Sequence, residues 1–186
     1  MNIANKISTF RILSVPFFIA CFVYYEPSKD YLRFLALAIF FLGVVSDILD
    51  GYIARKAKLQ SPAGLILDPL GDKLLLVSAF LCLFFTSNFP AGIRFPLWVI
   101  FIVISRDVII LLGVLVIFIV KQNIDINPTR WGKATTISQM AAIISVLTQW
   151  KYSYLVWDAA VIFTVISGVD YVRKGFILLY NSKSTA

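Results

Sequence analysis

The sequence predicts an all-α polytopic membrane protein with six transmembrane helices and a short N-terminal juxtamembrane segment. Three observations predict this fold: an apolar composition, long apolar runs, and breaks between them that contain charge, proline or glycine. Of 186 residues, 60% are hydrophobic and 15% are charged, and the mean hydropathy is +0.87. Soluble domains are nearer to about 45–50% apolar and about 25% charged. We treat residues 1–186 as a single membrane domain, because no repeat or long linker divides them.

The predicted helices are apolar runs, and the longer ones are long enough to cross a hydrocarbon core of ~30 Å, which takes about 20 helical residues. The segment "MNIANKISTFR" comes before the first run and is polar and mildly amphipathic, which predicts the juxtamembrane segment. The breaks read "YYEPSKD", "RKAKLQSP", "SNFPAGIRFP", "KQNIDINPTRWGK" and "QWKY". The six predicted spans are residues 11–25, 31–54, 64–87, 96–120, 134–150 and 155–173.

The distribution of lysine and arginine predicts the orientation in the membrane. Eleven of these residues fall on the side that holds both termini, and four fall on the opposite side. Because cytoplasmic loops carry the excess of positive charge, both termini are expected in the cytoplasm. The net charge of +7 fits attraction to anionic lipid, and the scattered basic residues argue against nucleic-acid binding. Cys21 and Cys82 lie in apolar runs and are expected to be packing residues rather than a disulfide or metal pair.

Four aspartates interrupt this apolar pattern. Asp47, Asp50, Asp68 and Asp72 are four of only ten acidic residues in the chain. Residues three or four apart share a helix face, and a short connection makes the second and third spans antiparallel neighbours. We therefore expect the four carboxylates to converge near the cytoplasmic boundary of the membrane. The alternative is that they are ordinary interfacial charges, but ionisable groups within membrane spans are costly and usually functional.

Convergent carboxylates predict a metal site, because four of them cannot all ionise at close range without cations between them. Oxygen ligands favour hard ions such as Mg²⁺ or Mn²⁺, and the chain has no histidine that would favour zinc. The predicted metal ligands are Asp47, Asp50, Asp68 and Asp72. Gly51, Ala54 and Gly64 are small residues beside this cluster, and they leave room for a large ligand. Hard cations held by carboxylates at a membrane surface are typical of phosphate binding.

The stretch "DILDGYIARKAKLQSPAGLILDPLGD" fits D-x-x-D-G-x-x-A-R-x8-G-x3-D-x3-D at every fixed position. This pattern resembles the signature of the CDP-alcohol phosphatidyltransferases. The opening "NIANKISTFRILSVP" is similar to the start of that family, with Ala4 and Ser8 where proline and threonine are usual. "INPTRWGKATTISQM" resembles the entry to the fifth span in its glycerophospholipid branch. The resemblance implies a six-helix fold, a homodimer, and a cytoplasm-facing cavity that opens sideways to lipid.

The reaction that the resemblance implies is transfer of the phosphatidyl group of CDP-diacylglycerol to an alcohol, with CMP as the leaving group. Two Mg²⁺ or Mn²⁺ ions would neutralise the diphosphate and stabilise the attacking and leaving oxygens. In this scheme Asp72 is the general base and also contacts the second ion, while the other three aspartates are ligands. The residues that would bind the nucleotide are Ser8, Gly51, Ala54, Arg55 and Gly64.

Basic residues further along the chain are candidates for binding the acceptor. Arg106 lies beside Asp107 inside the fourth span, where an arginine is costly. It would either support the cavity and meet acceptor phosphate or form an internal salt bridge that fixes helix packing. Lys133 and Arg130 precede or enter the fifth span, where they could bind acceptor phosphate.

The identity of the acceptor depends on two short strings. The glycerol 3-phosphate branch usually shows R-E in the fourth span and G-K-x-K-T before the fifth, whereas this chain has Arg106-Asp107 and "GKATT", with Thr135 in place of the second lysine. Loss of a cation should weaken binding of a phosphomonoester more than of a phosphodiester, and "ISRDV" resembles the cardiolipin synthases. The sequence therefore favours phosphatidylglycerol as acceptor, with glycerol 3-phosphate as the alternative. A non-enzymatic transporter is a distant alternative, because no repeat is visible and the carboxylates lie near one face.

Overall fold

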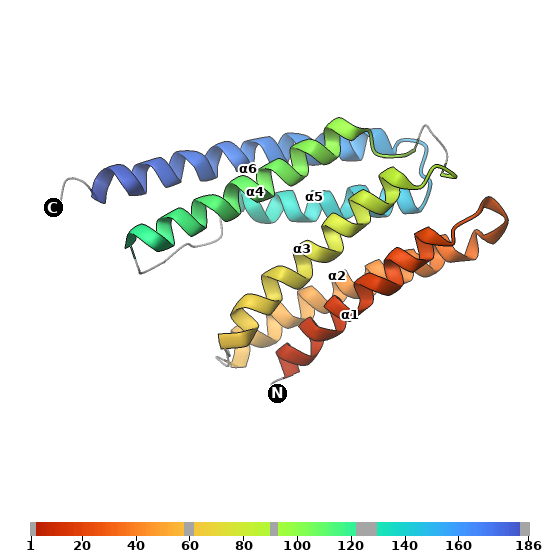
Figure 1. Ribbon diagram of the computed structural model, residues 1–186, viewed down its shortest axis with the longest axis horizontal. Helices are drawn as coiled ribbons and strands as arrows, with labels where there is room; N and C mark the ends of the chain where they lie inside the picture. The colour runs from red at the N-terminus through yellow and green to blue at the C-terminus, as the bar shows by residue number, and fades with distance from the viewer. Residues whose placement is uncertain (1–2, 58–61, 90–92, 122–129, 183–186) are drawn as a thin grey trace. The chain divides into compact units, whose positions relative to one another are not determined.

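The computed structural model describes the backbone of residues 3–57, 62–89, 93–121 and 130–182 and the side chains of residues 11–46, 73–89, 93–113 and 131–175 (Figure 1). All regular structure within these ranges is helical, so the predicted all-α class is confirmed. The elements are α1 (Ile3–Val23), the 3-10 helix η1 (Pro27–Lys29), α2 (Tyr31–Ala57), α3 (Pro62–Phe85), α4 (Leu97–Lys121), α5 (Arg130–Leu147) and α6 (Ser153–Ser182).

Each of the six predicted spans coincides with one of the described α-helices, and α1 and α6 extend furthest beyond the predicted bounds. Helix α1 already begins at Ile3, so the predicted juxtamembrane segment is continuous with the first span, and α6 continues to Ser182. Among the described residues, Ser153–Gly175 is long and apolar enough to cross a membrane. Shorter apolar helical segments are Arg11–Val23, Tyr31–Ser46 and Lys73–Phe85. Six membrane crossings with cytoplasmic termini remain a prediction.

The helices form two compact units. Unit 1 comprises residues 1–95 and 143–151, and unit 2 comprises residues 96–142 and 152–186. In unit 1, α1 packs against both α2 and α3. The ring of Phe18 on α1 is fully buried, with centroids 5.1 Å from Phe22 and 6.1 Å from Phe40 of α2. Close packing of this kind holds helices together in a bilayer, where hydrocarbon surrounds them and the hydrophobic effect between helices is weak.

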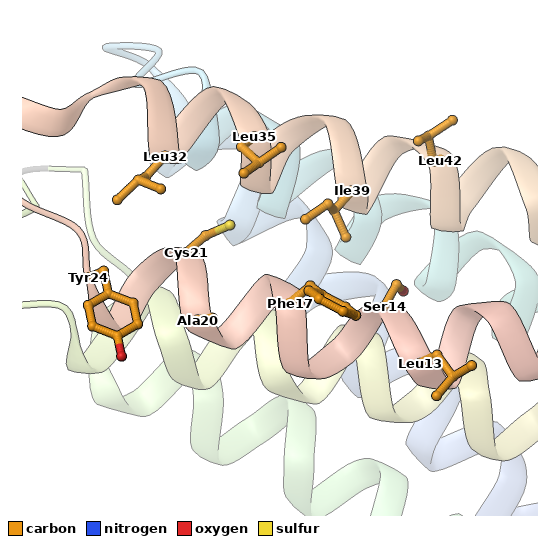
Figure 2. A pocket seen from close by; sticks show the side chains of 10 residues that line it. All are labelled: Leu13, Ser14, Phe17, Ala20, Cys21, Tyr24, Leu32, Leu35, Ile39 and Leu42. Carbon is orange, nitrogen blue, oxygen red and sulfur yellow. The ribbon is translucent and has the colours of Figure 1, made fainter.

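An apolar groove runs between α1 and α2 of unit 1 (Figure 2). Its volume is about 440 Å³. The residues that line it are Leu13, Ser14, Phe17, Ala20, Cys21, Tyr24, Leu32, Leu35, Ile39 and Leu42. The Ser14 hydroxyl donates to the carbonyl of Arg11, at 2.7 Å, so this polar group is satisfied within its own helix. The groove therefore offers a hydrocarbon surface. Cys21 and Cys82 are both free, as predicted.

A buried arginine lies at the end of unit 1 that is remote from the acidic segment. Arg33, at the start of α2, is 7% exposed and binds Asp30 with Nε and Nη2, at 2.7 and 2.6 Å. Its Nη1 donates to the carbonyl of Leu147, at 2.7 Å. Leu147 is the last residue of α5, whose final carbonyls have no partner within the helix. Arg33 thus provides a C-terminal cap and a positive charge at the negative end of the helix dipole.

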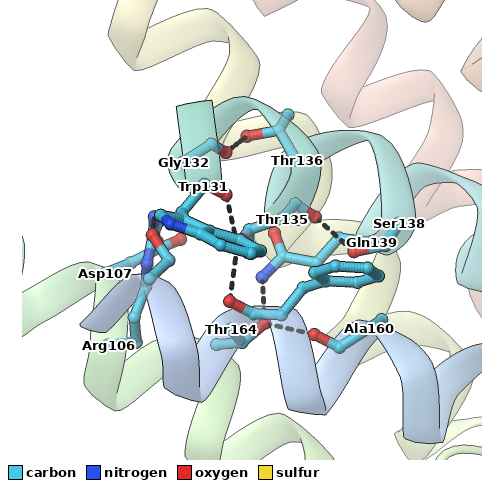
Figure 3. Close-up of polar contacts among 12 residues, drawn as sticks. Arg106, Asp107, Trp131, Gly132, Thr135, Thr136, Ser138, Gln139, Ala160 and Thr164 are labelled. Carbon is cyan, nitrogen blue, oxygen red and sulfur yellow. Dashed lines mark hydrogen bonds and ion pairs between the residues drawn. The ribbon is translucent and has the colours of Figure 1, made fainter. Parts of the chain in front are cut away.

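In unit 2, α4 packs against α6, and polar side chains join α5 to α6 (Figure 3). Gln139 of α5 donates its side-chain amide to the hydroxyl of Thr164, at 3.1 Å, and that hydroxyl lies 2.6 Å from the carbonyl of Ala160. The Thr135 hydroxyl lies 2.9 Å from the carbonyls of both Trp131 and Phe163. These hydrogen bonds fix one arrangement of the two helices, although Oε1 of Gln139 is buried without a hydrogen-bond partner.

We expect Arg33→Gln to destabilise the protein by roughly 1–3 kcal/mol, because a buried carbonyl and a carboxylate lose charge-assisted hydrogen bonds. Thermal unfolding in detergent measures the effect. Lys29→Gln is the matched control: its ion pair with Glu26 is exposed, with side chains 46% and 55% accessible, and such pairs contribute little.

The Arg33→Gln variant also tests how the stability of the protein depends on pH. Hydrogen bonds from Arg33 hold the pKa of Asp30 below its usual range. The stability that this pair provides is complete above the ordinary aspartate pKa of about 4 and is lost as the pH falls through the lowered pKa. The difference in melting temperature between wild type and Arg33→Gln should therefore narrow in strong acid. A difference that stays constant down to pH ~2 would show that Asp30 does not contribute.

Candidate active site

The acidic motif lies on two neighbouring helices of unit 1. Asp47 and Asp50 lie in α2, Asp68 and Asp72 lie in α3, and α2 and α3 pack against each other. The prediction that adjacent helices carry the two aspartate pairs is confirmed. The side chains of residues 47–72 lie outside the described residues, so convergence of the carboxylates remains a prediction. The predicted nucleotide-binding residues, Ser8, Gly51, Ala54, Arg55 and Gly64, also have side chains outside that part of the chain.

Next to the motif, α2 and α3 approach each other closely at Gly43. A Cβ atom at this position would lie 2.5 Å from Cδ2 of Leu75 on α3, closer than side-chain atoms normally come. A larger residue at position 43 would therefore displace the Leu75 side chain. Asp47 is four residues after Gly43, and Asp72 is three residues before Leu75, so the close approach lies one helical turn from two motif aspartates.

Arg11 of α1 lies close to Gly43 in unit 1, and the sequence predicted no role for it in the site. Its side chain is only 2% exposed, and its Cγ would lie 3.9 Å from a Cβ atom on Gly43. The sequence contains a signal for this: Arg11 is a charged residue at the start of an apolar run and belongs to the opening motif. Arg11 entered the sequence analysis only in the count of positive charges on each side of the membrane, so the burial of its side chain was not considered.

Arg106 links α4 to α6 in unit 2 through Ser167, and Figure 3 shows it next to Asp107. It is 8% exposed, its Nη1 lies 2.7 Å from Oδ1 of Asp107, and its Nη2 donates to the Ser167 hydroxyl at 2.7 Å. Its Cζ lies 5.8 Å from the centre of the Tyr171 ring, within range of a cation–π contact. These contacts match the second of the two roles considered for Arg106, an internal salt bridge that fixes helix packing. The predicted role of Arg106 in acceptor binding remains a prediction.

The other candidates for acceptor binding lie at the start of α5. Lys133 is exposed in the first turn of the helix, as an anion-binding residue requires. Arg130 is the first residue of α5, but its side chain lies outside the described residues. Thr135, which stands where the glycerol 3-phosphate branch usually has its second lysine, is fully buried, and its hydroxyl contacts the carbonyl of Phe163 on α6. Motif spacing did not predict this burial, because it does not identify which face of a helix meets its neighbour.

Comparisons with known proteins identify the family. The profile of the CDP-alcohol phosphatidyltransferase family matches residues 1–166. A CDP-diacylglycerol–glycerol-3-phosphate 3-phosphatidyltransferase of Aquifex aeolicus is 30% identical, over 97% of this chain and 99% of the relative. The protein of the same name from Haemophilus influenzae is 34% identical, over 90% and 86%. A probable phosphatidylglycerophosphate synthase of Mycobacterium tuberculosis is 29% identical, over 100% and 87%.

The family profile thus covers most of the chain, including both helices with the acidic motif and the buried Arg11. The similarity also extends over nearly the whole length of these relatives. This chain therefore belongs to the CDP-alcohol phosphatidyltransferase family.

Proposed function

We propose that this protein transfers the phosphatidyl group of CDP-diacylglycerol to glycerol 3-phosphate, releasing CMP and forming phosphatidylglycerophosphate. The observation that carries the proposal is the extent of similarity: the relatives named for this activity match from 86% to 99% of their own length. The motif on α2 and α3, complete at all its fixed positions, supports the same reaction.

The acceptor differs from the one that the sequence favoured. The argument for phosphatidylglycerol depended on a missing lysine at position 135, and this position is buried against α6. A neutral side chain there no longer argues against a phosphomonoester. Lys133 is exposed in the first turn of α5, where the positive end of the helix dipole also favours an anion. Glycerol 3-phosphate, the alternative acceptor, therefore replaces phosphatidylglycerol in the proposal.

The groove on unit 1 supports a lipid substrate. Apolar side chains line most of its length, and one end is formed by Leu13 and Leu42 (Figure 2). Leu42 directly precedes Gly43, where α2 and α3 come together one turn from Asp47 and Asp72. Along α2, the apolar groove is thus followed by the acidic motif. A lipid could place its acyl chains on the first and its charged headgroup at the second.

The donor set of the motif fits Mg²⁺ or Mn²⁺. Its potential ligands are the carboxylates of Asp47, Asp50, Asp68 and Asp72, and no histidine occurs in the chain. Hard divalent ions prefer such oxygen ligands. Two bound ions would supply charge neutralisation for the diphosphate of the nucleotide.

Protein side chains carry out the proton transfer and hold the two substrates. Asp72 accepts the proton of the attacking hydroxyl group of glycerol 3-phosphate. That oxygen forms a bond to the phosphorus next to the lipid, and the bond from this phosphorus to the bridging oxygen breaks, so that CMP leaves. Lys133 and Arg130 hold the acceptor phosphate, and Arg55 contacts the diphosphate. Fixing both reactants in this geometry lowers the entropic part of the barrier.

The proposal places the enzyme in the membrane as a homodimer, with six crossings per chain and the acidic motif and both termini in the cytoplasm. The exposed apolar residues support a lipid environment: Phe17, Phe101 and Leu111, from both units, are 69%, 71% and 64% exposed. Contiguous exposed apolar surface is unusual in soluble monomers.

Removal of divalent ions should abolish CMP release. Purified protein in excess chelator is expected to be inactive, and Mg²⁺ or Mn²⁺ should restore turnover, whereas Zn²⁺ should restore it poorly because the ligands are all oxygen. CMP is measured by chromatography. Full activity in excess chelator would contradict the proposed metal site.

Substitution of two aspartates should separate metal binding from proton transfer. Asp68→Asn is expected to raise the concentration of Mn²⁺ needed for half-maximal activity. Asp72→Asn should retain CDP-diacylglycerol binding and lower turnover by roughly 10²–10⁴, the effect typical of a lost general base. Nucleotide binding is measured by titration and turnover by CMP release. An equal loss of CDP-diacylglycerol affinity in both variants would make Asp72 chiefly a ligand.

The acceptor is tested by the mass of the lipid product. Wild-type protein with CDP-diacylglycerol and glycerol 3-phosphate should form the two-chain phosphatidylglycerophosphate, and phosphatidylglycerol should be a poor acceptor. Efficient formation of a four-chain product from phosphatidylglycerol would restore the cardiolipin assignment.

Lys133→Gln provides a second readout, because it removes an exposed cation from the start of α5. It should raise KM for glycerol 3-phosphate and leave KM for CDP-diacylglycerol unchanged. Lys151→Gln removes an exposed lysine outside the predicted sites and serves as the matched control.

A further inference from the structure

The side chain of Arg11 lies where the three helices of unit 1 meet. It starts from α1, and its Cγ would be 3.9 Å from a Cβ atom on Gly43 of α2. The same Cβ atom would touch Leu75 of α3, at 2.5 Å. With only 2% of its surface exposed, Arg11 occupies the interior of this bundle.

Two motif aspartates lie one helical turn from this meeting point. Asp47 follows Gly43 by four residues and shares a face of α2 with it, and Asp72 precedes Leu75 by three and shares a face of α3 with that residue. One turn of helix rises about 5.4 Å. Both aspartates are displaced in the same direction, toward the ends of α2 and α3 that follow each other in the chain.

The direction of the Arg11 side chain fits this displacement. Side chains of an α-helix lean toward its N-terminus. Helix α1 is antiparallel to α2, so its N-terminal end lies beside the C-terminal end of α2, which carries Asp47 and Asp50 (Figure 1). From this general tendency we infer that the Arg11 side chain extends beyond Cγ toward the acidic motif.

The charges also agree with this placement. A buried arginine requires negative groups, because removing a guanidinium from water costs several kcal/mol. Both other buried arginines of the described residues follow this rule, since Arg33 binds Asp30 and Arg106 binds Asp107. The acidic residues within one helical turn of Gly43 and Leu75 are Asp47 and Asp72. A guanidinium has five donors in a planar fork and can hold two carboxylates at once.

We propose that Arg11 is a positioning residue of the acidic site, whose guanidinium holds the carboxylates of Asp47 and Asp72 in the orientation that metal binding requires. Arg11 acts through these aspartates and does not touch the reacting atoms. The inference rests on the proposed function only in so far as the aspartates bind a metal ion. Partners that orient a ligand typically change metal affinity or activity by about 10–100-fold when they are removed.

Binding of Mn²⁺ to the purified protein without substrate, measured by electron paramagnetic resonance, tests this role. Arg11→Gln should weaken Mn²⁺ binding about 10–100-fold and lower turnover similarly. Arg11→Lys keeps the charge but cannot hold two carboxylates, and it should be intermediate in both measurements. The matched control is Arg33→Gln, which removes a buried arginine from the other end of unit 1. It should lower the melting temperature but leave Mn²⁺ affinity and turnover of the folded protein unchanged.

Wild-type Mn²⁺ affinity in folded Arg11→Gln protein would overturn the proposal, since a purely structural arginine predicts loss of stability alone. If Arg11→Gln does not fold, Arg11→Lys decides: wild-type affinity and turnover in that variant overturn the proposal, and a reduction of both supports it. Wild-type protein that releases CMP but binds no Mn²⁺ would instead overturn the proposed metal site. The two failures are therefore distinguishable.

Discussion

The fold depends on the constraint that a charge removed from water must meet an opposite charge or several hydrogen-bond partners. Arg11, Arg33 and Arg106 are each at least 90% buried. Arg33 joins the start of α2 to the end of α5, and Arg106 joins α4 to α6. Such groups add little net stability compared with apolar residues of the same size, but they are strongly destabilising when mispaired. They therefore select which helices pack together and in which register, a choice that uniform apolar surfaces leave open.

The buried arginines at the two ends of unit 1 meet this need for partners in different ways. At one end, Arg33 is satisfied by a carboxylate three residues earlier in the chain and by the final carbonyl of α5, and nothing else is required of it. At the other end, Arg11 approaches Gly43, four residues before the first of the four motif aspartates. The first arrangement is complete within the protein. In the second, the proposed site, one arginine cannot pair with all four carboxylates, and the remaining carboxylate oxygens are the proposed metal ligands.

Apolar runs and their breaks predicted all six helices, because helix length and bilayer thickness are linked by simple geometry. The continuity of residues 3–10 with the first span was not predicted, since polarity reports on the surroundings of a helix rather than on its backbone. Motif spacing placed the aspartates on adjacent helices. It did not predict the burial of Thr135, because spacing does not reveal the neighbouring helix, and charge counting left Arg11 without a role. Such positions depend on tertiary contacts between residues distant in sequence, such as Gly43 and Leu75.

The pairing of Arg106 with the next residue in the chain has a consequence for biogenesis. Between Leu97 and Val120, α4 contains Arg106 and Asp107 as its only charged residues, so this stretch has no net charge. An arginine at the centre of an inserting helix costs about 2.5–3.5 kcal/mol on translocon-based scales. The counter-ion lies on the adjacent residue, at 2.7 Å, so the pair forms within α4 alone. If α4 crosses the bilayer as proposed, its insertion therefore does not depend on another helix, and only the contact with Ser167 requires α6.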